Sequence, residues 1–274
     1  MYMKLRDGKS KVLTLSYDDG VVEDIRLIKI MDKYGLKGTF NINTGLYFPE
    51  NEEREEYLGR MKLSEALELY KDSVHEVAVH SYTHPYLEQL SSQEVLTEIL
   101  KDRENIEKQY GTITRGMAYP CATFNDNVIE CLEKCGICYS RTGKSTENFN
   151  FPQNWLVLNP TCHHMNGKLM QLAKRFIEEK PHLHNNWMFY LWGHSYEFRV
   201  DNNWEVIEEF AEYMGGRDEI WYATNIEIYD YVKAYERLRV SVDKSIVHNP
   251  SDIDVWFVEK GKTYMIKAGE TINI

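Results

Sequence analysis

The fold of this chain can be read from one stretch near its start, Val12-Leu13-Thr14-Leu15-Ser16-Tyr17-Asp18-Asp19-Gly20. The first six residues are rich in β-formers and apolar side chains, which predicts a buried strand. Apolar residues at helical spacing follow over residues 25–31, and Gly35 closes that pattern. The stretch therefore predicts a strand, a turn that carries two carboxylates, and a helix.

The same order of strand and helix recurs along the chain. Seven or eight alternations predict an α/β protein with a parallel sheet, either closed as a barrel or doubly wound. We favour a barrel because polar residues gather where the strands end, and catalytic groups of barrels lie at the carboxyl ends of strands. Further strands are expected at 39–42, 74–79, 116–119, 137–140, 155–158, 187–192 and 220–223, and helices at 63–70, 91–110, 128–135, 169–179, 204–214 and 226–238.

The tail from about residue 240 changes in character. Short apolar runs are separated there by Asn249-Pro250, Gly261 and Gly269, a pattern that predicts a small antiparallel β meander. About 35 residues rarely fold alone, so this meander should pack on the barrel. We therefore expect two parts, a barrel over 1–239 and a C-terminal β appendage over 240–274.

The charge balance excludes several classes of partner. The net charge is −11, from 32 Lys and Arg against 43 Asp and Glu. Nucleic acid and anionic membrane surfaces need a basic face, so neither is expected as a partner. The sequence has no apolar run long enough to cross a bilayer and no leader-like segment. It reads as cytoplasmic as it stands, or as extracytoplasmic if a signal peptide has been removed; the oligomeric state is left open.

Two groups of residues are candidates for metal binding and catalysis. The first is the pair Asp18 and Asp19 after a strand, and the second is His80 with His84, also after a strand. One carboxylate and two imidazoles suit Zn²⁺ or another divalent first-row metal. Each pattern alone is weak, because an Asp-Asp pair after a strand is usually a helix cap or a solvated turn, and a His-x-x-x-His pair alone is more often not a metal site. Their occurrence together at two strand ends of one barrel favours a metal site.

These motifs resemble those of the polysaccharide deacetylases, the NodB-homology or carbohydrate esterase family 4 type. Leu15–Gly20 resembles the first motif, written T-F-D-D-G, and His75–Pro85 looks like the second. Ala118-Tyr119-Pro120-Cys121 lies where the third is expected, and Leu191-Trp192-Gly193-His194 is similar to the L-x-x-H of the fifth. The resemblance runs from about residue 11 to residue 232 and implies a distorted (β/α)7-type barrel.

The resemblance also implies a role for each motif residue. It implies a metal-dependent hydrolase that removes acetyl groups from an N-acetylated or O-acetylated carbohydrate, with Zn²⁺ as the expected ion and Co, Ni, Mn or Fe as alternatives. Asp18 would be the general base, His194 the general acid, and the backbone N–H of Cys121 an oxyanion donor. The implied metal ligands are Asp19, His80 and His84.

The sequence departs from the family pattern in the third and fourth motifs. Ala118 stands where the family carries an arginine that orients the base, and Arg115 lies three residues earlier. Our hypothesis is that Arg141, at the end of the next predicted strand, supplies the cation beside Asp18. The alternative is that Arg141 is an ordinary surface residue.

Several aromatic and apolar residues near these motifs are candidates for substrate contact. Leu191 and Trp192 could shape a pocket for the acetyl methyl group, although strand alternation turns only one of them inward. Aromatic rings also suit the faces of sugar rings. The further candidates for the sugar are Tyr82, Tyr119 and Tyr196.

Other functions fit parts of the pattern. An amidase that acts on a non-sugar C–N bond would use the same residues, and the altered motifs leave room for it. A non-catalytic carbohydrate-binding barrel would not need the intact base and acid. Two histidines and one carboxylate also serve non-haem Fe(II) oxygenases, but helices are too frequent here for their usual β-rich scaffold.

Overall fold

A parallel sheet forms the centre of the computed structural model, which describes residues 1–53 and 59–274. Seven strands follow the order β6-β5-β4-β3-β2-β8-β7, and β9 pairs with β2 beside that path. All neighbours in this sheet are parallel, as the alternation of strand and helix predicted. The strands are β2 (Lys11–Asp18), β3 (Gly38–Ile42), β4 (Glu76–Val79), β5 (Gly116–Ala118), β6 (Tyr139–Arg141), β7 (Cys162–His163), β8 (Trp187–Gly193) and β9 (Ile220–Tyr222).

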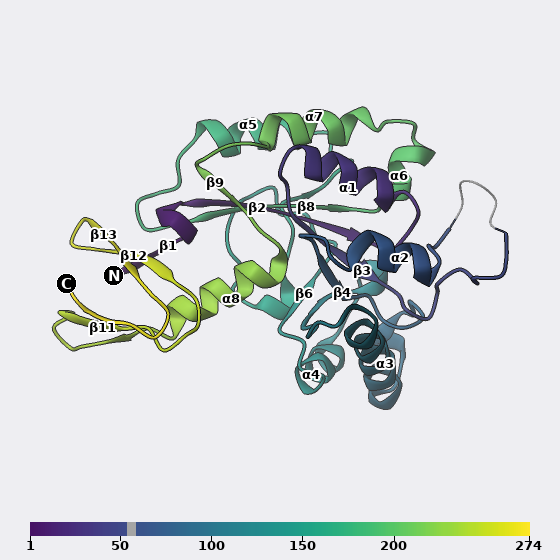
Figure 1. Ribbon diagram of the computed structural model, residues 1–274, viewed down its shortest axis with the longest axis horizontal. Coiled ribbons are helices and arrows are strands. Elements are labelled where there is room, and N and C mark those ends of the chain that lie inside the picture. Colours follow the sequence, from purple (N-terminus) through teal and green to yellow (C-terminus); the bar gives the residue numbers. More distant parts are fainter. Residues whose placement is uncertain (54–58) are drawn as a thin grey trace.

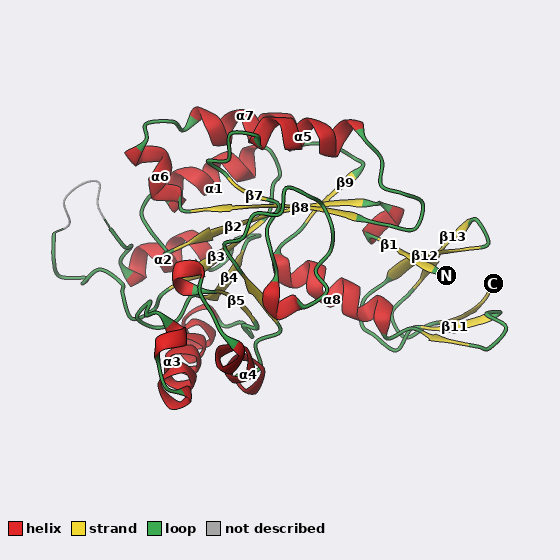
Figure 2. Ribbon diagram, turned by 180° about the vertical axis from the view of Figure 1, so that it is seen from behind, coloured by secondary structure: helices red, strands yellow, loops and turns green. Residues whose placement is uncertain are grey.

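Helices cover the outside of this sheet. Figures 1 and 2 show α1, α5 and α7 together on one side and α3 with α4 on another. The longest helix, α3, begins with a capping box between Ser91 and Glu94 and ends at Gly111 in the left-handed conformation. The helices are α1 (Asp24–Lys33), α2 (Leu63–Tyr70), α3 (Ser92–Tyr110), α4 (Asp126–Lys134), α5 (Leu169–Glu178), α6 (Ser195–Val200), α7 (Glu205–Met214) and α8 (Asn225–Glu236).

The sheet curls into a half-barrel whose open side is bridged by residues 158–163. Leu158 forms a parallel bridge with Arg141 on β6, and β7 pairs with β8 at the other edge. The strand predicted at 155–158 is wrong, because Trp155–Val157 form a 3-10 turn in which the Asn154 side chain accepts a hydrogen bond from the Leu156 N–H. The predicted distorted (β/α)7-type barrel is confirmed.

Alternation along β2 separates two environments. Leu13, Leu15 and Tyr17 belong to the large core between the sheet and its helices. Thr14, Ser16 and Asp18, at the alternate positions, are also buried but form hydrogen bonds or ion pairs across the barrel interior. The interior of the barrel is therefore partly polar, and its polar side chains lead toward the carboxyl ends of the strands.

The tail forms two small antiparallel sheets. Its first sheet has the order β1-β12-β13 and its second β10-β11-β14. The first strand of the chain thus pairs with the tail, while the division of the chain at residue 239 stays a prediction. None of the described helices is both long and apolar enough to cross a membrane. The strands are β1 (Tyr2–Lys4), β10 (Arg239–Val240), β11 (Ile246–His248), β12 (Val255–Glu259), β13 (Lys262–Ile266) and β14 (Thr271–Asn273).

A buried carboxyl group lies at the start of β4. Glu76 accepts hydrogen bonds from the Tyr139 hydroxyl (2.7 Å), the Thr39 hydroxyl (2.9 Å) and the Ile226 N–H (3.0 Å). Burial raises the pKa of Glu76 to about 7, although these hydrogen bonds oppose the rise. Glu76 therefore keeps its proton in the folded protein at pH values where the unfolded chain has lost it.

This difference predicts how stability depends on pH. The contribution of Glu76 is complete below its unfolded pKa of 4.5 and is lost as the pH rises through the folded value of about 7. We expect Glu76→Gln, which is neutral at every pH, to flatten this fall in unfolding free energy by up to about 3 kcal/mol. Urea unfolding at several pH values measures it, with the exposed Glu68→Gln as control. Equal pH slopes for Glu76→Gln and the parent protein would contradict the expectation.

Candidate active site

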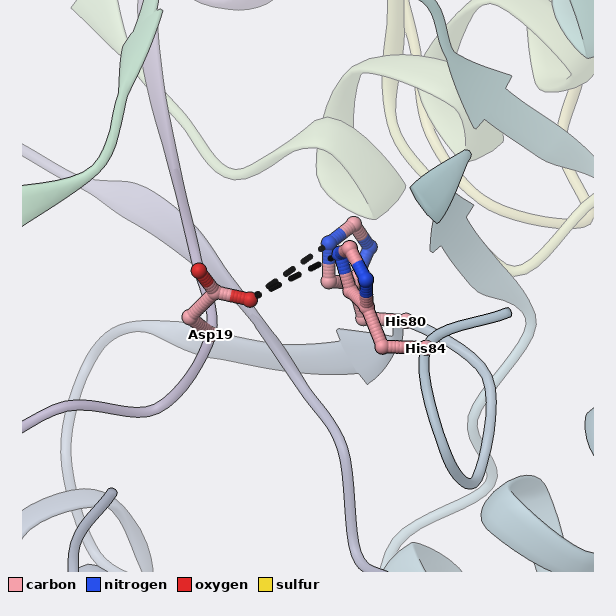
Figure 3. A group of neighbouring side chains, drawn as sticks. All are labelled: Asp19, His80 and His84. Carbon is pink, nitrogen blue, oxygen red and sulfur yellow. Dashed lines mark ion pairs between the residues drawn. The ribbon is translucent and has the colours of Figure 1, made fainter. Parts of the chain in front are cut away.

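Three predicted metal ligands converge at the carboxyl ends of the strands. Asp19 follows β2, His80 follows β4, and His84 lies in the loop after it (Figure 3). The Oδ1 atom of Asp19 is 3.9 Å from Nε2 of His80 and 3.8 Å from Nε2 of His84. The three ligand atoms all lie within 4.8 Å of one another, so one small ion could contact all three after minor adjustment.

The backbone around these residues is unusual. Asp19, Ser81 and His84 have φ angles of 87°, 65° and 58°, in the region that side chains other than glycine rarely adopt. Cys121 and Ala122, in the loop after β5, have φ angles of 55° and 57°. Such strain is characteristic of sites where a loop must aim a side chain or a backbone N–H in one direction.

The hydrogen bonds of His80 leave one ring nitrogen for a metal. Its Nδ1 lies 2.8 Å from the carbonyl oxygen of Ala118, so this nitrogen carries the proton and donates it. Nε2 is then the lone-pair nitrogen that faces Asp19. Burial, the largest cause, lowers the pKa of His80 to about 4, so the ring stays neutral. Asp102 on α3 accepts a hydrogen bond from the His80 backbone N–H (3.1 Å) and fixes the start of this loop.

Asp19 has a buried oxygen suited to a cation. Its Oδ1 atom forms no hydrogen bond with the described residues, although the Arg60 guanidinium makes an ion pair with it at 2.9 Å. Arg60 also donates to the backbone carbonyl of Asp19, which helps to fix the strained turn. A buried carboxylate oxygen without a hydrogen bond, next to two imidazole rings, fits a divalent transition metal.

Asp18 lies beside this group and is held at both oxygens. Arg141 donates to Oδ2, and Asn41 donates to Oδ1 at 2.9 Å. Burial favours a higher pKa for Asp18, but the charge of Arg141, with its hydrogen bond, outweighs it and lowers the pKa to about 2. Asp18 is therefore ionised throughout the working pH range.

Arg141 is one of the most buried side chains in the molecule. Its side chain is 1% exposed, it is paired with Asp18, and its guanidinium lies 4.3 Å from the centre of the Trp192 ring. The alternative of a surface arginine is therefore wrong. Arg115, the other candidate, instead pairs with Asp230 at 2.5 Å on a half-exposed face.

Three histidines surround the carboxylate of Glu197 on α6. Glu197 Oε2 lies 3.1 Å from Nε2 of both His163 and His164, and Oε1 lies 3.4 Å from Nδ1 of His194. His194 in turn places its Nε2 atom 3.8 Å from Asp18 Oδ2. Burial opposes the charged form of His194, but Glu197 and the aspartates raise its pKa above the ordinary value.

His163, His164 and Glu197 also lie close enough to form a second metal-sized group. The Nδ1 atom of His163, however, accepts a hydrogen bond from the Met165 N–H at 3.2 Å, so its proton resides on Nε2. A protonated Nε2 donates to Glu197 and is not a metal ligand. The group is therefore better described as a set of ion-pair contacts that hold Glu197 in place.

The predicted substrate residues divide into two sets. Trp192 faces the barrel interior, where it contacts Arg141, and the half-buried Tyr196 lies with its ring centre 5.3 Å from that of His194. Cys121 is exposed, and its Sγ atom is 3.9 Å from Nδ1 of His84. These three residues border the candidate metal ligands and their neighbours.

The other substrate candidates lie elsewhere. Leu191 is 0% exposed in the outer core, because alternation along β8 turns it toward the helices, so its assignment to an acetyl pocket is wrong. Tyr119 is buried, donates to the Leu156 carbonyl oxygen at 2.8 Å and stacks on Phe124, so it is also not at the mouth. The Tyr82 ring lies under the Lys101 ammonium group on α3, 3.8 Å from it.

Sequence reasoning missed several neighbours of the site. Glu197 lies three residues after His194, a helical spacing that could have revealed it. Asn41, Arg60 and Asp102 come from separate elements, and no spacing in the sequence connects them with the aspartates or histidines. Only the assembled barrel brings them together.

Fold and site together define the class of the protein. The curled parallel sheet carries a carboxylate, two imidazoles and a second, buried carboxylate at its carboxyl-terminal edge. Residues 6–140 match the family model described as polysaccharide deacetylase. This part of the chain, just under half of its length, matches the polysaccharide deacetylase family, as its motifs predicted.

Solved structures support the fold. A Mycobacterium smegmatis protein classed with the polysaccharide deacetylases superposes with a TM-score of 0.59 at 15% identity, covering 86% of this chain and 94% of that one. The peptidoglycan deacetylase PdaC from Bacillus subtilis gives 0.51 at 19% identity, over 83% and 94%. A family 4 carbohydrate esterase from Streptomyces lividans gives 0.50 at 18% identity, over 77% and 91%. A comparison with curated proteins found no match.

The contact between Glu197 and His194 yields a prediction. We expect Glu197→Gln to lower the pKa of His194, because the variant removes the charge that favours the imidazolium. NMR titration of the His194 ring in metal-free protein measures this directly. Glu205→Gln, an exposed change on α7, is the matched control. An unchanged His194 titration in Glu197→Gln would show that Glu197 does not govern the charge of this ring.

Proposed function

We propose that the protein is a metal-dependent hydrolase that removes acetyl groups from an N-acetylated or O-acetylated carbohydrate. The observation that carries this proposal is the convergence of Asp19, His80 and His84 next to the buried pair of Asp18 and Arg141. The family match supports acetyl hydrolysis on a carbohydrate as the general reaction. The panel of acetylated sugars described below identifies which sugar is the substrate.

The metal would be held by Asp19, His80 and His84. One carboxylate oxygen and two imidazole nitrogens leave further positions open, which a hydrolytic centre requires. Zn²⁺ fits this donor set, and Co, Ni, Mn or Fe would fit it as well. When bound, the ion supplies Lewis acidity toward a water molecule and the acetyl carbonyl group.

Asp18 would act as the general base. It is ionised at every working pH, and its Oδ2 atom is the oxygen nearest the Nε2 atoms of His80 and His194, at 3.9 and 3.8 Å. Arg141 keeps this carboxylate charged and fixed in place. A water molecule between Asp18 and the metal ligands could therefore lose a proton to Oδ2 as it attacks the acetyl carbon.

His194 would act as the general acid. Glu197 contacts its Nδ1 atom and stabilises the imidazolium, so Nε2 carries a proton toward Asp18 and the reacting group. Transfer of that proton to the leaving nitrogen or oxygen completes the hydrolysis. The backbone N–H of Cys121, in its strained turn, is our candidate for the oxyanion donor.

Trp192 and Tyr196 would contact the substrate. Trp192 lies between Arg141 and His163, and Tyr196 lies next to His194, so both rings border the acid. Aromatic faces of this kind pack against the C–H faces of a sugar. A small apolar acetyl methyl group would then rest near Trp192 rather than near Leu191.

Metal removal tests the proposal. We expect acetate release from at least one member of a panel of N-acetyl oligosaccharides and O-acetylated sugars, loss of that release with a chelator, and recovery with Zn²⁺. His80→Ala should lose the metal, whereas Asp18→Asn should keep it and lose at least about 100-fold in kcat. Asp126→Asn, on exposed α4, is the control. Acetate release untouched by Asp18→Asn, or no release from any acetylated sugar by metal-loaded protein, would contradict the proposal.

The role of Arg141 gives a separate prediction. We expect Arg141→Ala to lower kcat about 10- to 100-fold and to destabilise the fold by about 3–5 kcal/mol, because it leaves a buried carboxylate unpaired. Arg141→Lys keeps the charge, so it should fold and recover part of the activity. Arg115→Ala removes the neighbouring arginine at a half-exposed position and serves as control. Parental kcat in Arg141→Ala would remove Arg141 from the mechanism.

A further inference from the structure

Asn41 is a buried amide on β3, next to β2 in the barrel. Its backbone is paired in register with Asp18, and its side chain is 0% exposed. A polar side chain buried this completely is costly unless its hydrogen bonds are specific. Asn41 therefore requires an explanation that the metal ligands, the base and the acid do not supply.

The hydrogen bonds of Asn41 lead to the general base. Its Nδ2 atom donates to Asp18 Oδ1 at 2.9 Å and to Ser16 Oγ at 2.8 Å. The reversed amide orientation would place Asn41 Oδ1 against the Asp18 carboxylate, where two acceptors repel each other. The amide is thus fixed with its N–H groups toward Asp18.

This contact distinguishes the two oxygens of Asp18. Asn41 occupies Oδ1, while Oδ2 accepts from Arg141 and faces His80 and His194. Arg141 alone could remain bound while the carboxylate turns about its Cβ–Cγ bond. A second donor on the other oxygen stops that rotation, so Oδ2 stays directed at the reacting water.

The Asn41 side chain lies among other buried polar side chains that form hydrogen bonds in the barrel interior. Ser16 on β2 accepts from Asn41, and Tyr190 on the neighbouring strand β8 accepts from Asn225 Nδ2 at 2.6 Å at the start of α8. These side chains lie in the barrel interior, where packing leaves little freedom to move.

We propose that Asn41 is a positioning residue that fixes the carboxylate plane of Asp18 and so selects Oδ2 as the proton-accepting oxygen. This inference rests on the proposed function, because it assigns Asn41 to the base of that reaction. The Asn41 side chain bonds to none of the proposed metal ligands, and its backbone carbonyl, which accepts from the Asp19 N–H at 2.9 Å, is kept in any side-chain variant. Its effect should therefore appear in turnover and not in binding.

The test uses Asn41→Leu in the metal-loaded full chain. Leucine has a similar volume and no donor, so we expect kcat to fall about 10- to 100-fold while KM and metal content stay within about twofold. In an Asp18→Asn background, Asn41→Leu should cause no further loss, because the oxygen that it positions no longer accepts a proton. Additive losses in the double variant, or parental kcat in the single one, would overturn the proposal.

Two further variants separate positioning from folding. Asn249→Leu removes a buried amide of the tail that donates to the Ile253 carbonyl oxygen at 2.8 Å, and its kcat should match the parent. Asn41→Thr keeps one hydroxyl donor on a residue that suits a strand, so its kcat should fall less than that of Asn41→Leu. If the leucine variant does not fold, the kcat of Asn41→Thr is compared with the parent protein instead.

A crystal structure of Asn41→Leu provides a result that is independent of turnover. We expect the Asp18 carboxylate to be rotated or to occupy two orientations. An unchanged carboxylate in that crystal would overturn the positioning role even if the protein is an active deacetylase. If the parent protein releases no acetate but the Asp18 carboxylate is rotated in the variant, the reaction assigned to Asp18 is overturned. The positioning of its side chain by Asn41 would still be established.

Discussion

The ion pair between Asp18 and Arg141 is the interaction on which the site depends. Both side chains are almost completely buried, so either charge alone would be strongly unfavourable, and together they oblige β2 and β6 to meet across the barrel interior. These strands are separated by three others in the sheet, so their side chains can meet only if the sheet curls. The pair that keeps the base ionised is thus also a constraint on the curvature of the barrel.

A partly polar interior distinguishes this barrel from one filled with branched apolar residues. Thr14 donates to Asn225 of α8, and Asn41 donates to Ser16 and Asp18 on the neighbouring strand. Apolar packing tolerates small shifts, whereas a buried hydrogen bond has a narrow range of distances and angles. The apolar core between the sheet and its helices accounts for most of the buried apolar side chains. The polar side chains inside the barrel fix the orientation of the functional groups.

The sequence allowed the fold class, the family and the convergence of Asp19, His80 and His84 to be predicted, because these depend on periodicity and on short motifs. The position of Arg141 beside Asp18 is also predictable, since both residues are expected at strand ends. Leu191 was assigned wrongly because the inward face of a strand cannot be read from a run that is apolar on both faces. The role of Asn41 could not be predicted, because an isolated asparagine in a strand belongs to no motif. It follows only from the pairing of Asn41 with Asp18 on the neighbouring strand.

The irregular segment over residues 158–163 has a consequence for the spacing of the catalytic groups. It touches β6 through Leu158 at one edge and β8 through β7 at the other, so its length sets how far apart these two edges lie. The proposed acid follows β8, and the arginine that holds the base ends β6. A homologue with one residue inserted there would have a wider gap, and would need a longer side chain or a different partner to keep acid and base at one reacting carbon.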